Sequence, residues 1–223
     1  GFHGTSHAYV SEKAAEHLNR PYDELKIITC HLGNGGSITA VENGKSIDTS
    51  MGMTPLAGIP MGTRSGDIDP AIIKYLMDEH DALSAADIDK VLNKQSGMLA
   101  ISGISSDMRD IEDAAAEGHE RSQLAIEMYV KGVKKFIGSY MAEMNGADVI
   151  VFTAGIGENS ALFRELILSD MEGLGIILDK ERNNNAGDVD VISSDDSNIV
   201  AMAISTDEEY YIANETSRVL SNN

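Results

Sequence analysis

Hydrophobic residues recur at helical spacing in several parts of the chain. Val10, Ala14 and Leu18 stand four residues apart, which predicts a helix that ends near Asn19. Asp69-Pro70 is typical of a helix start, with the Asp69 side chain as the cap. Helical patterns predict further helices over residues 70–79, 84–94, 120–144 and 159–169.

Strand patterns lie between these helices. The apolar run at 26–31 predicts a buried strand, and alternating residues at 37–42 and 45–50 flank Asn43-Gly44, a strong β-hairpin signal. These three strands predict an antiparallel meander. Two more strands are predicted at 148–155 and 199–205. A meander followed by strand–helix pairs indicates an α/β fold with a mixed sheet flanked by helices.

Three segments are read from local composition instead of periodicity. Residues 51–70 are rich in Gly and Pro, which predicts a long ordered loop of the kind that carries function. The polar stretch at 183–198 predicts a surface loop. Thr206 and Glu209 have the spacing of a capping box, which predicts a last helix that runs to about residue 220.

Composition narrows the classes of function. A formal net charge of −19 argues against a nucleic-acid surface, so an anionic substrate must be held by a few local cations and backbone N–H groups. No membrane span or signal peptide is found, so a cytoplasmic location is expected. The single cysteine, Cys30, is expected in the core and fits a reducing compartment. Because the chain begins with Gly1 and not Met, a fragment or a processed chain is expected.

Two glycine turns are candidates for phosphate binding. In "HLGNGGS", residues 31–37, the glycines around Asn34 let the backbone approach an anion, although a plain hairpin turn explains them equally well. In "TAGIGENS", residues 153–160, the turn joins a strand to a helix whose positive end could face a phosphate. The alternative there is a tight connection without a ligand. Two such turns can grip opposite ends of one nucleotide.

Few cations are placed to bind phosphate. Arg64 lies in the loop "MGTRSGD" near Asp67, a position suited to a transferring phosphoryl group, and Arg109 lies in "SSDMRD". Solvent exposure is the alternative for both. His3 and His7 could form a metal pair on a helix, but Gly4 predicts that the helix begins later. A hydrogen bond from His3 to a transferring oxyanion is the functional hypothesis, and a buried structural histidine is the alternative.

Six stretches resemble the acetate and propionate kinase family in order and spacing. They are "GFHGTSH", "HLGNGGS", "PMGTRSGDIDP", "SSDMRD", "FTAGIGENS" and "STDEE". The resemblance implies the two-lobed fold of sugar kinases and actin, which is ribonuclease H-like. Residues 1–223 resemble its C-terminal, nucleotide-binding lobe, without the N-terminal lobe. The last helix, 207–220, is then expected to pack against that lobe in the complete protein.

The resemblance also implies roles for single residues. His3 and Arg64 would stabilise the transferring phosphoryl group, and Glu208 would bind magnesium, whereas Glu209 is assigned to the capping box. The implied nucleotide-binding residues are His31, Leu32, Gly33, Asn34, Gly35, Asp107, Met108, Arg109, Gly155, Ile156, Gly157, Glu158 and Asn159.

The family reaction implied is reversible transfer of the γ-phosphoryl group of ATP to acetate, which gives acetyl phosphate and ADP. Its cofactor is Mg²⁺, with Mn²⁺ possible in its place, and its quaternary state is a homodimer. This chain alone is expected to be inactive because the other lobe is missing. Alternatives are a propionate or butyrate kinase, and a non-catalytic module for nucleotide binding or dimerisation.

Overall fold

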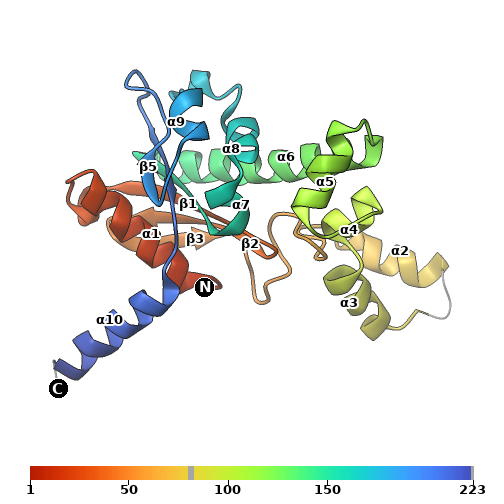
Figure 1. Cartoon of the computed structure of the whole chain (residues 1–223). Helices are drawn as coiled ribbons and strands as arrows, with labels where there is room; N and C mark the ends of the chain where they lie inside the picture. The colour runs from red at the N-terminus through yellow and green to blue at the C-terminus, as the bar shows by residue number, and fades with distance from the viewer. Residues whose placement is uncertain (80–82, 222–223) are drawn as a thin grey trace. The chain divides into compact units, whose positions relative to one another are not determined.

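The computed structural model describes residues 1–79 and 83–221 and contains one six-stranded sheet (Figure 1). By its internal contacts the chain divides into two compact units. The first comprises Gly1–Gly33, Ser37–Thr49 and Lys134–Asn223, and the second comprises Asn34–Gly36 and Ser50–Val133.

The sheet has the strand order β3-β2-β1-β4-β6-β5. β1 pairs in parallel with β4, and β4 with β6, whereas β3 runs antiparallel to β2 and β5 antiparallel to β6. The predicted mixed sheet is therefore confirmed. The strands are β1 (Lys26–Leu32), β2 (Gly36–Glu42), β3 (Lys45–Thr49), β4 (Val149–Thr153), β5 (Val189–Val191) and β6 (Val200–Ile204).

The β2–β3 hairpin follows the predicted pattern. Glu42 pairs with Lys45, and both Asn43 and Gly44 have positive φ, at 54° and 72°. These angles match the turn type that Asn-Gly sequences favour between antiparallel strands. β2 lies next to β1 in the sheet, so all three predicted strands of the meander are side by side.

Both faces of the sheet are buried. On one face, Val10 and Ala14 of helix α1 (Gly4–His17) pack in one cluster with Ile27, Val149 and Met202. The residues of the other face are also inaccessible, and Cys30 among them has no exposed surface, which confirms its predicted place in the core. A sheet that is buried on both sides explains why β1, β4 and β6 read as continuous apolar runs.

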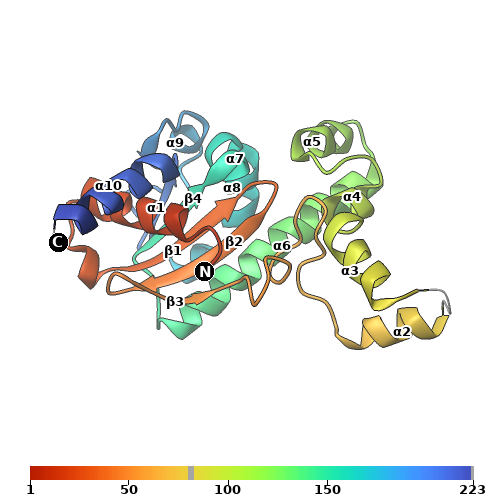
Figure 2. The same ribbon diagram turned by 90° about the horizontal axis from the view of Figure 1, so that it is seen from below.

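Four further helices that lie wholly in the first unit follow β4 in sequence. They are α7 (Ala154–Asn159), α8 (Ala161–Leu168), α9 (Lys180–Asn184) and α10 (Glu208–Ser221). Short 3₁₀ turns occur at Tyr22–Glu24 and Glu172–Leu174. Figure 2, seen from below, shows α10 beside α1, in agreement with the contacts between these two helices.

The second unit is helical. It contains α2 (Ala71–Glu79), α3 (Ala85–Lys94), α4 (Gly97–Ser102), α5 (Met108–Ala116) and the first part of α6 (Glu120–Glu143), which continues into the first unit. The predicted helices at 70–79, 84–94 and 120–144 are confirmed. Asp69 Oδ1 accepts the backbone N–H of Ala71 at 2.9 Å, as expected of a cap.

Several predicted local structures differ from those observed. Residues 154–155 begin helix α7 and do not extend the strand. The stretch at 183–198, predicted as loop, contains the end of α9 and the edge strand β5. Helices α4 and α5 were not predicted, because they are short and follow glycine- and serine-rich sequence.

The predicted capping box at Thr206 is wrong. Asp207 caps α10 instead, since its Oδ1 accepts the N–H of Tyr210 at 2.9 Å. The N–H of Thr206 donates to Glu158 Oε1 at 3.0 Å. Glu158 thus occupies the Thr206 N–H that the Glu209 side chain was expected to bind, and no capping box forms.

Candidate active site

Helix α1 begins at Gly4, which is earlier than the sequence predicted. His3 is its N-cap and adopts the left-handed conformation, with φ 57° and ψ 22°. The carbonyl oxygen of His3 accepts the N–H of His7 at 2.9 Å. His3 and His7 therefore stand one helical turn apart, at the cap and inside the first turns of one helix.

His31, at the end of β1, joins these two histidines in one cluster. Its ring stacks on that of His3, with centroids 4.0 Å apart and planes 15° from parallel. Ser37 Oγ, on β2, lies 2.8 Å from His3 Nδ1 and 2.6 Å from His7 Nε2. One hydroxyl group thus bridges two imidazoles, and a third imidazole covers the face of the His3 ring.

Two of the three imidazoles are neutral at physiological pH. Burial, together with the nearby charges of His31 and His3, lowers the pKa of His7 to about 3. Burial, followed by the charge of His3, lowers the pKa of His31 to about 4. Among residues 1–79 and 83–221 there is no group of three or more His, Cys, Asp or Glu side chains that could hold a metal ion.

The first glycine turn, at Asn34 and Gly35, belongs to the second unit and packs against a loop there. The carbonyl oxygen of Asn34 accepts the N–H of Gly62 at 3.1 Å. A Cβ atom at Gly62 would lie 2.2 Å from Asn34 Oδ1, so a larger residue at position 62 would displace the Asn34 side chain. The geometry ties the turn to the loop that carries Arg64.

Arg64 is fixed within that loop of the second unit. Its guanidinium donates to the carbonyl oxygen of Pro55 at 2.8 Å. Its own carbonyl accepts the N–H of Met61 at 3.0 Å, and the carbonyl of Met61 accepts the N–H of Met98 at 2.8 Å. The predicted ordered loop at 51–70 is confirmed, because its backbone is bonded both to itself and to α4. Asp67 Oδ1 stabilises the loop further, because it accepts a hydrogen bond from the N–H of Gly58 at 2.8 Å.

The second glycine turn, Gly155–Asn159, forms helix α7. Glu158 Oε1 accepts hydrogen bonds from Thr153 Oγ1 at 3.2 Å, from the N–H of Ala154 at 2.8 Å and from the N–H of Thr206 at 3.0 Å. Ala154 has a φ of 64°, an unusual value for a residue with a side chain. The Glu158 carboxylate therefore stabilises the tight turn that follows β4 and links this turn to Thr206.

Asp107 and Arg109 pair with each other in the second unit. Asp107 caps α5 by accepting the N–H of Arg109 at 3.0 Å, and Arg109 Nη2 donates to Asp107 Oδ2 at 2.6 Å. The hydrogen bonds from Arg109 lower the pKa of Asp107 to about 2. The Arg109 side chain is exposed, at 86%. Met108, between them, is buried.

Glu208 begins helix α10 in the first unit, and its Oε1 accepts a hydrogen bond from Thr5 Oγ1 at 3.0 Å. Thr5 is two residues from His3, so this contact brings the proposed magnesium ligand to the same end of α1 as the histidine cluster. Thr5 and Glu208 lie 203 residues apart in sequence. No periodicity or motif spacing could have predicted this contact.

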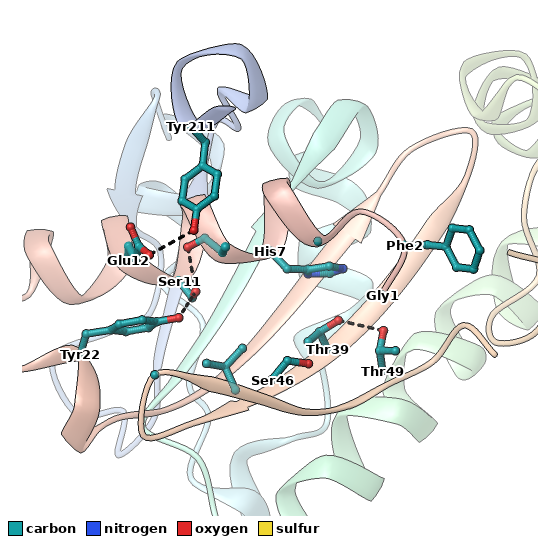
Figure 3. A pocket seen from close by; sticks show the side chains of 14 residues that line it. Gly1, Phe2, His7, Ser11, Glu12, Tyr22, Thr39, Ser46, Thr49 and Tyr211 are labelled. Carbon is teal, nitrogen blue, oxygen red and sulfur yellow. Dashed lines mark hydrogen bonds between the residues drawn. The ribbon is translucent and has the colours of Figure 1, made fainter. Parts of the chain in front are cut away.

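A cavity of about 160 Å³ lies beside the cluster, between α1, the β2–β3 hairpin and α10. Figure 3 shows His7 and Thr39 on its wall, with Tyr211 entering from α10. Tyr211 donates a long hydrogen bond of 3.4 Å to Glu12, and Tyr22 lies 2.8 Å from Ser11. The cavity is lined mostly by small and polar side chains, and the sequence did not predict it.

The sequence-predicted site residues thus fall into two groups. The first unit holds His3, His31, Leu32, Gly33, Gly155, Ile156, Gly157, Glu158, Asn159 and Glu208. The second unit holds Asn34, Gly35, Arg64, Asp107, Met108 and Arg109.

A sequence profile of the Acetokinase family matches residues 1–214. This match covers nearly the whole chain and includes every predicted site residue. The chain belongs to the acetokinase family.

Relatives of known sequence agree with this assignment. The acetate kinase of Thermoanaerobacterium thermosaccharolyticum is 60% identical over 99% of this chain and 55% of that protein. The acetate kinase of Methanosarcina barkeri is 55% identical over 99% of the chain and 54% of that protein. The chain thus spans about half the length of the curated relatives it matches.

Solved structures of an acetate kinase and a propionate kinase have the same fold. The acetate kinase of Porphyromonas gingivalis matches with a TM-score of 0.95 and 50% identity, over 99% of this chain and 55% of that one. A propionate kinase from Francisella tularensis matches with a TM-score of 0.89 and 49% identity, over 96% and 54%. The expected α/β fold class is confirmed. No helix among the described residues is long and apolar enough to span a membrane.

Sequence reasoning missed the hydroxyl groups of the cluster. Ser37 bridges His3 and His7, Thr29 Oγ1 lies 2.6 Å from His7 Nδ1, and Ser6 Oγ lies 2.8 Å from His31 Nδ1. Each hydroxyl belongs to an element that also carries apolar residues at strand or helix spacing. The only signal was a polar residue on a buried strand, such as Thr29, which has no exposed surface.

Proposed function

We propose that the protein containing this chain is an acetate kinase, which transfers the γ-phosphoryl group of MgATP reversibly to acetate. The observation that carries the proposal is the 60% identity to an acetate kinase across 99% of the chain, with His3, Arg64 and Glu208 in its motifs. In this proposal the chain supplies the nucleotide-binding lobe and is inactive alone, since the relatives are nearly twice as long.

In-line phosphoryl transfer needs positioning and charge neutralisation, and it needs no covalent protein intermediate. Acetate and ATP are both anionic, so cationic or N–H groups must offset their repulsion as charge spreads over the equatorial oxygens. The proposal assigns this work to His3, whose ring is held by Ser37 and His31, and to Arg64, whose guanidinium is held by Pro55.

The nucleotide is assigned to the two glycine turns and to the start of α5. The Gly155–Asn159 helix presents backbone N–H groups, while Asp107–Arg109 offers an exposed guanidinium. Glu158 serves here as a structural member of the turn, because its Oε1 already accepts three protein hydrogen bonds.

Magnesium fits the residue proposed for it. Mg²⁺ in nucleotide sites is commonly held by one or two carboxylates together with substrate phosphates and water. Glu208 supplies one such carboxylate, and it is anchored through Thr5. When bound, the ion would neutralise phosphate charge. Mn²⁺ prefers similar oxygen ligands and could replace it.

A homodimer is also proposed. Leu124 and Met128 on α6 are 49% and 43% exposed, and Leu162 on α8 is 46% exposed. Large apolar side chains exposed on helices are typical of protein interfaces. Light scattering of the full-length gene product at tens of micromolar tests this part, and a monomer would contradict it.

The reaction is tested by assaying the full-length gene product for acyl phosphate formation from MgATP with acetate, propionate and butyrate. The proposal expects the highest kcat/KM with acetate. A higher value with propionate or butyrate would reassign the substrate, and no acyl phosphate from any of the three would refute a carboxylate kinase. Nucleotide binding without turnover would favour a non-catalytic module.

A further inference from the structure

A chain of four side chains leads from the interior of the sheet to His3. Thr29 Oγ1 lies 2.6 Å from His7 Nδ1, His7 Nε2 lies 2.6 Å from Ser37 Oγ, and Ser37 Oγ lies 2.8 Å from His3 Nδ1. Thr29 and Ser37 have no exposed surface, and His7 is 4% exposed. Because water cannot replace these contacts, the protons must be shared in an ordered way.

Each member of this chain has limited protons to donate. A hydroxyl group carries one proton, and a neutral imidazole carries one N–H and one acceptor nitrogen. Ser37 touches two imidazoles and is fully buried, so its own proton is used in these contacts only if it donates to one imidazole and accepts from the other. Two arrangements then satisfy all three contacts and use the Ser37 proton. In one, every proton points toward His3, and in the other, every proton points away from it.

The distance from Thr29 to its second partner distinguishes the two. If the protons point away from His3, the Thr29 hydroxyl must donate to the carbonyl oxygen of Thr39, which lies 3.5 Å away. If they point toward His3, Thr29 donates to His7 Nδ1 over 2.6 Å. A buried donor left on a long contact loses most of its hydrogen-bond energy, so the second arrangement is favoured.

The geometry points to Ser37 as a positioning residue that, with His7 and Thr29 behind it, fixes neutral His3 as the tautomer with its proton on Nε2. His7 donates from Nε2 to Ser37, and Ser37 donates to His3 Nδ1. The stack on His31 holds the plane of the His3 ring, and Ser37 holds its rotation within that plane.

This inference rests on the proposed function for its consequence. A His3 ring with its proton on Nε2 can donate an N–H to a phosphoryl oxygen while it is still neutral. Losing Ser37 would free the ring to turn about its side-chain bonds. A misplacement of the order of 1 Å at such a group costs about 100-fold in rate.

The tautomers are measured directly in the full-length gene product labelled with ¹⁵N-histidine. Long-range ¹H–¹⁵N correlation at pH 7.5 is expected to show Nδ1 as the unprotonated nitrogen and Nε2 as the protonated one, for both His3 and His7. Signals are assigned by the loss that follows His3→Gln and His7→Gln. Protonated Nδ1 atoms in both rings would show the opposite arrangement and overturn the inference.

Kinetics test the positioning role. Ser37→Ala is expected to lower kcat by about 100-fold with the KM for ATP almost unchanged, and Ser37→Thr, which keeps the hydroxyl, is expected to recover most of the loss. Ser11→Ala is the matched control, since Ser11 is another buried serine whose hydroxyl bonds to Tyr22 and not to an imidazole. An unchanged kcat in Ser37→Ala would refute the role.

The two proposals fail in distinguishable ways. If the gene product makes no acyl phosphate from acetate, propionate or butyrate, the proposed function fails, while the ¹⁵N signals still report the tautomers. If the enzyme is active but His3 carries its proton on Nδ1, only the inference fails. Urea unfolding of each variant verifies that a change in kcat does not come from a change in folding.

Discussion

Arg164 Nε donates a hydrogen bond to Asn183 Oδ1 at 2.7 Å, and both side chains are buried, at 3% and 0% exposure. The same guanidinium donates to the carbonyl oxygens of Gly157 at 2.9 Å, Glu158 at 2.6 Å and Asn183 at 2.7 Å. The last carbonyls of α7 are therefore satisfied by a buried cation. This arginine links the candidate nucleotide turn to α9.

Replacing Arg164 with leucine is expected to lower the free energy of unfolding by at least about 3 kcal/mol, because several buried acceptors lose their donors at once. The measurement is urea unfolding of the full-length gene product. Lys180→Ala is the control, since the Lys180–Glu165 ion pair at 2.6 Å is solvent-exposed on the lysine side and is expected to contribute little. Equal effects of the two substitutions would contradict the prediction.

Gly97→Ala is expected to disturb the loop that carries Arg64. A Cβ atom at Gly97 would lie 2.1 Å from the carbonyl oxygen of Met61 and 2.6 Å from that of Arg64. The backbone φ of Gly97 is 60°, in the region that favours glycine. The strain should cost about 1–3 kcal/mol in stability and lower kcat by displacing Arg64. Urea unfolding and steady-state kinetics measure the two effects.

Gly138→Ala is the matched control for that substitution. Gly138 lies inside helix α6, and apart from the neighbouring backbone of that helix no described atom comes within 4 Å of a Cβ placed there. Alanine in a helix interior is better than glycine by roughly 0.5–1 kcal/mol, so this variant should be slightly more stable than the wild type. A Gly97→Ala protein as stable as Gly138→Ala would show that the loop adapts.

Acid is expected to destabilise the fold through His7 and His31. Folding lowers their pKa values from 6.5 to about 3 and about 4, so the unfolded state binds more protons between pH 6.5 and about 4. Stability is full above that window and falls as the pH drops through it, by up to about 1.4 kcal/mol per pH unit for each imidazole. Below the folded pKa values this contribution levels off.

The contribution of His7 is isolated by comparing variants over that pH range. The free energy of unfolding of His7→Gln should depend less steeply on pH than that of the wild type, by about 1.4 kcal/mol per unit. His17→Gln, at an exposed position on the same helix, should keep the wild-type slope. Identical slopes for all three proteins would mean that His7 does not stay neutral on folding.

Arg64→Ala in the full-length gene product is expected to lower kcat by roughly 10³-fold or more, as for arginines that stabilise phosphoryl transfer, with a nearly unchanged KM for ATP. Arg20→Ala is the control, because Arg20 pairs on the surface with Asp148. A loss confined to KM would show that Arg64 only binds substrate.

The sequence by itself determined the elements whose pattern is local. The helix at 120–144, the strand at 26–31 and the Asn43-Gly44 hairpin were predicted because apolar spacing and turn residues reflect backbone geometry within a few positions. The motifs around His3, Asn34, Arg64 and Glu208 also identified the family, since their order is a property of the sequence alone.

Short elements depended on tertiary contacts. Helix α4 begins at Gly97 with a positive φ, and its first N–H groups donate hydrogen bonds to the loop carbonyls of Met61 and Gly62. The edge strand β5 forms because β6 offers a partner. The cap of α10 moved to Asp207 because Glu158 took the N–H of Thr206. The loop carbonyls that bind α4 and the Glu158 carboxylate that binds Thr206 are both distant in sequence from these elements.

Only the tertiary structure decided how the candidate site is built. His3 and Ser37 are 34 residues apart, and Thr5 and Glu208 are 203 apart, so their contacts depend on how α1 lies on the sheet and where α10 begins. A hydroxyl group on a buried strand has the same sequence signature whether it faces a carbonyl or an imidazole. The sequence names the reactive residues, whereas the packing of distant segments sets which atoms hold them and where their protons lie.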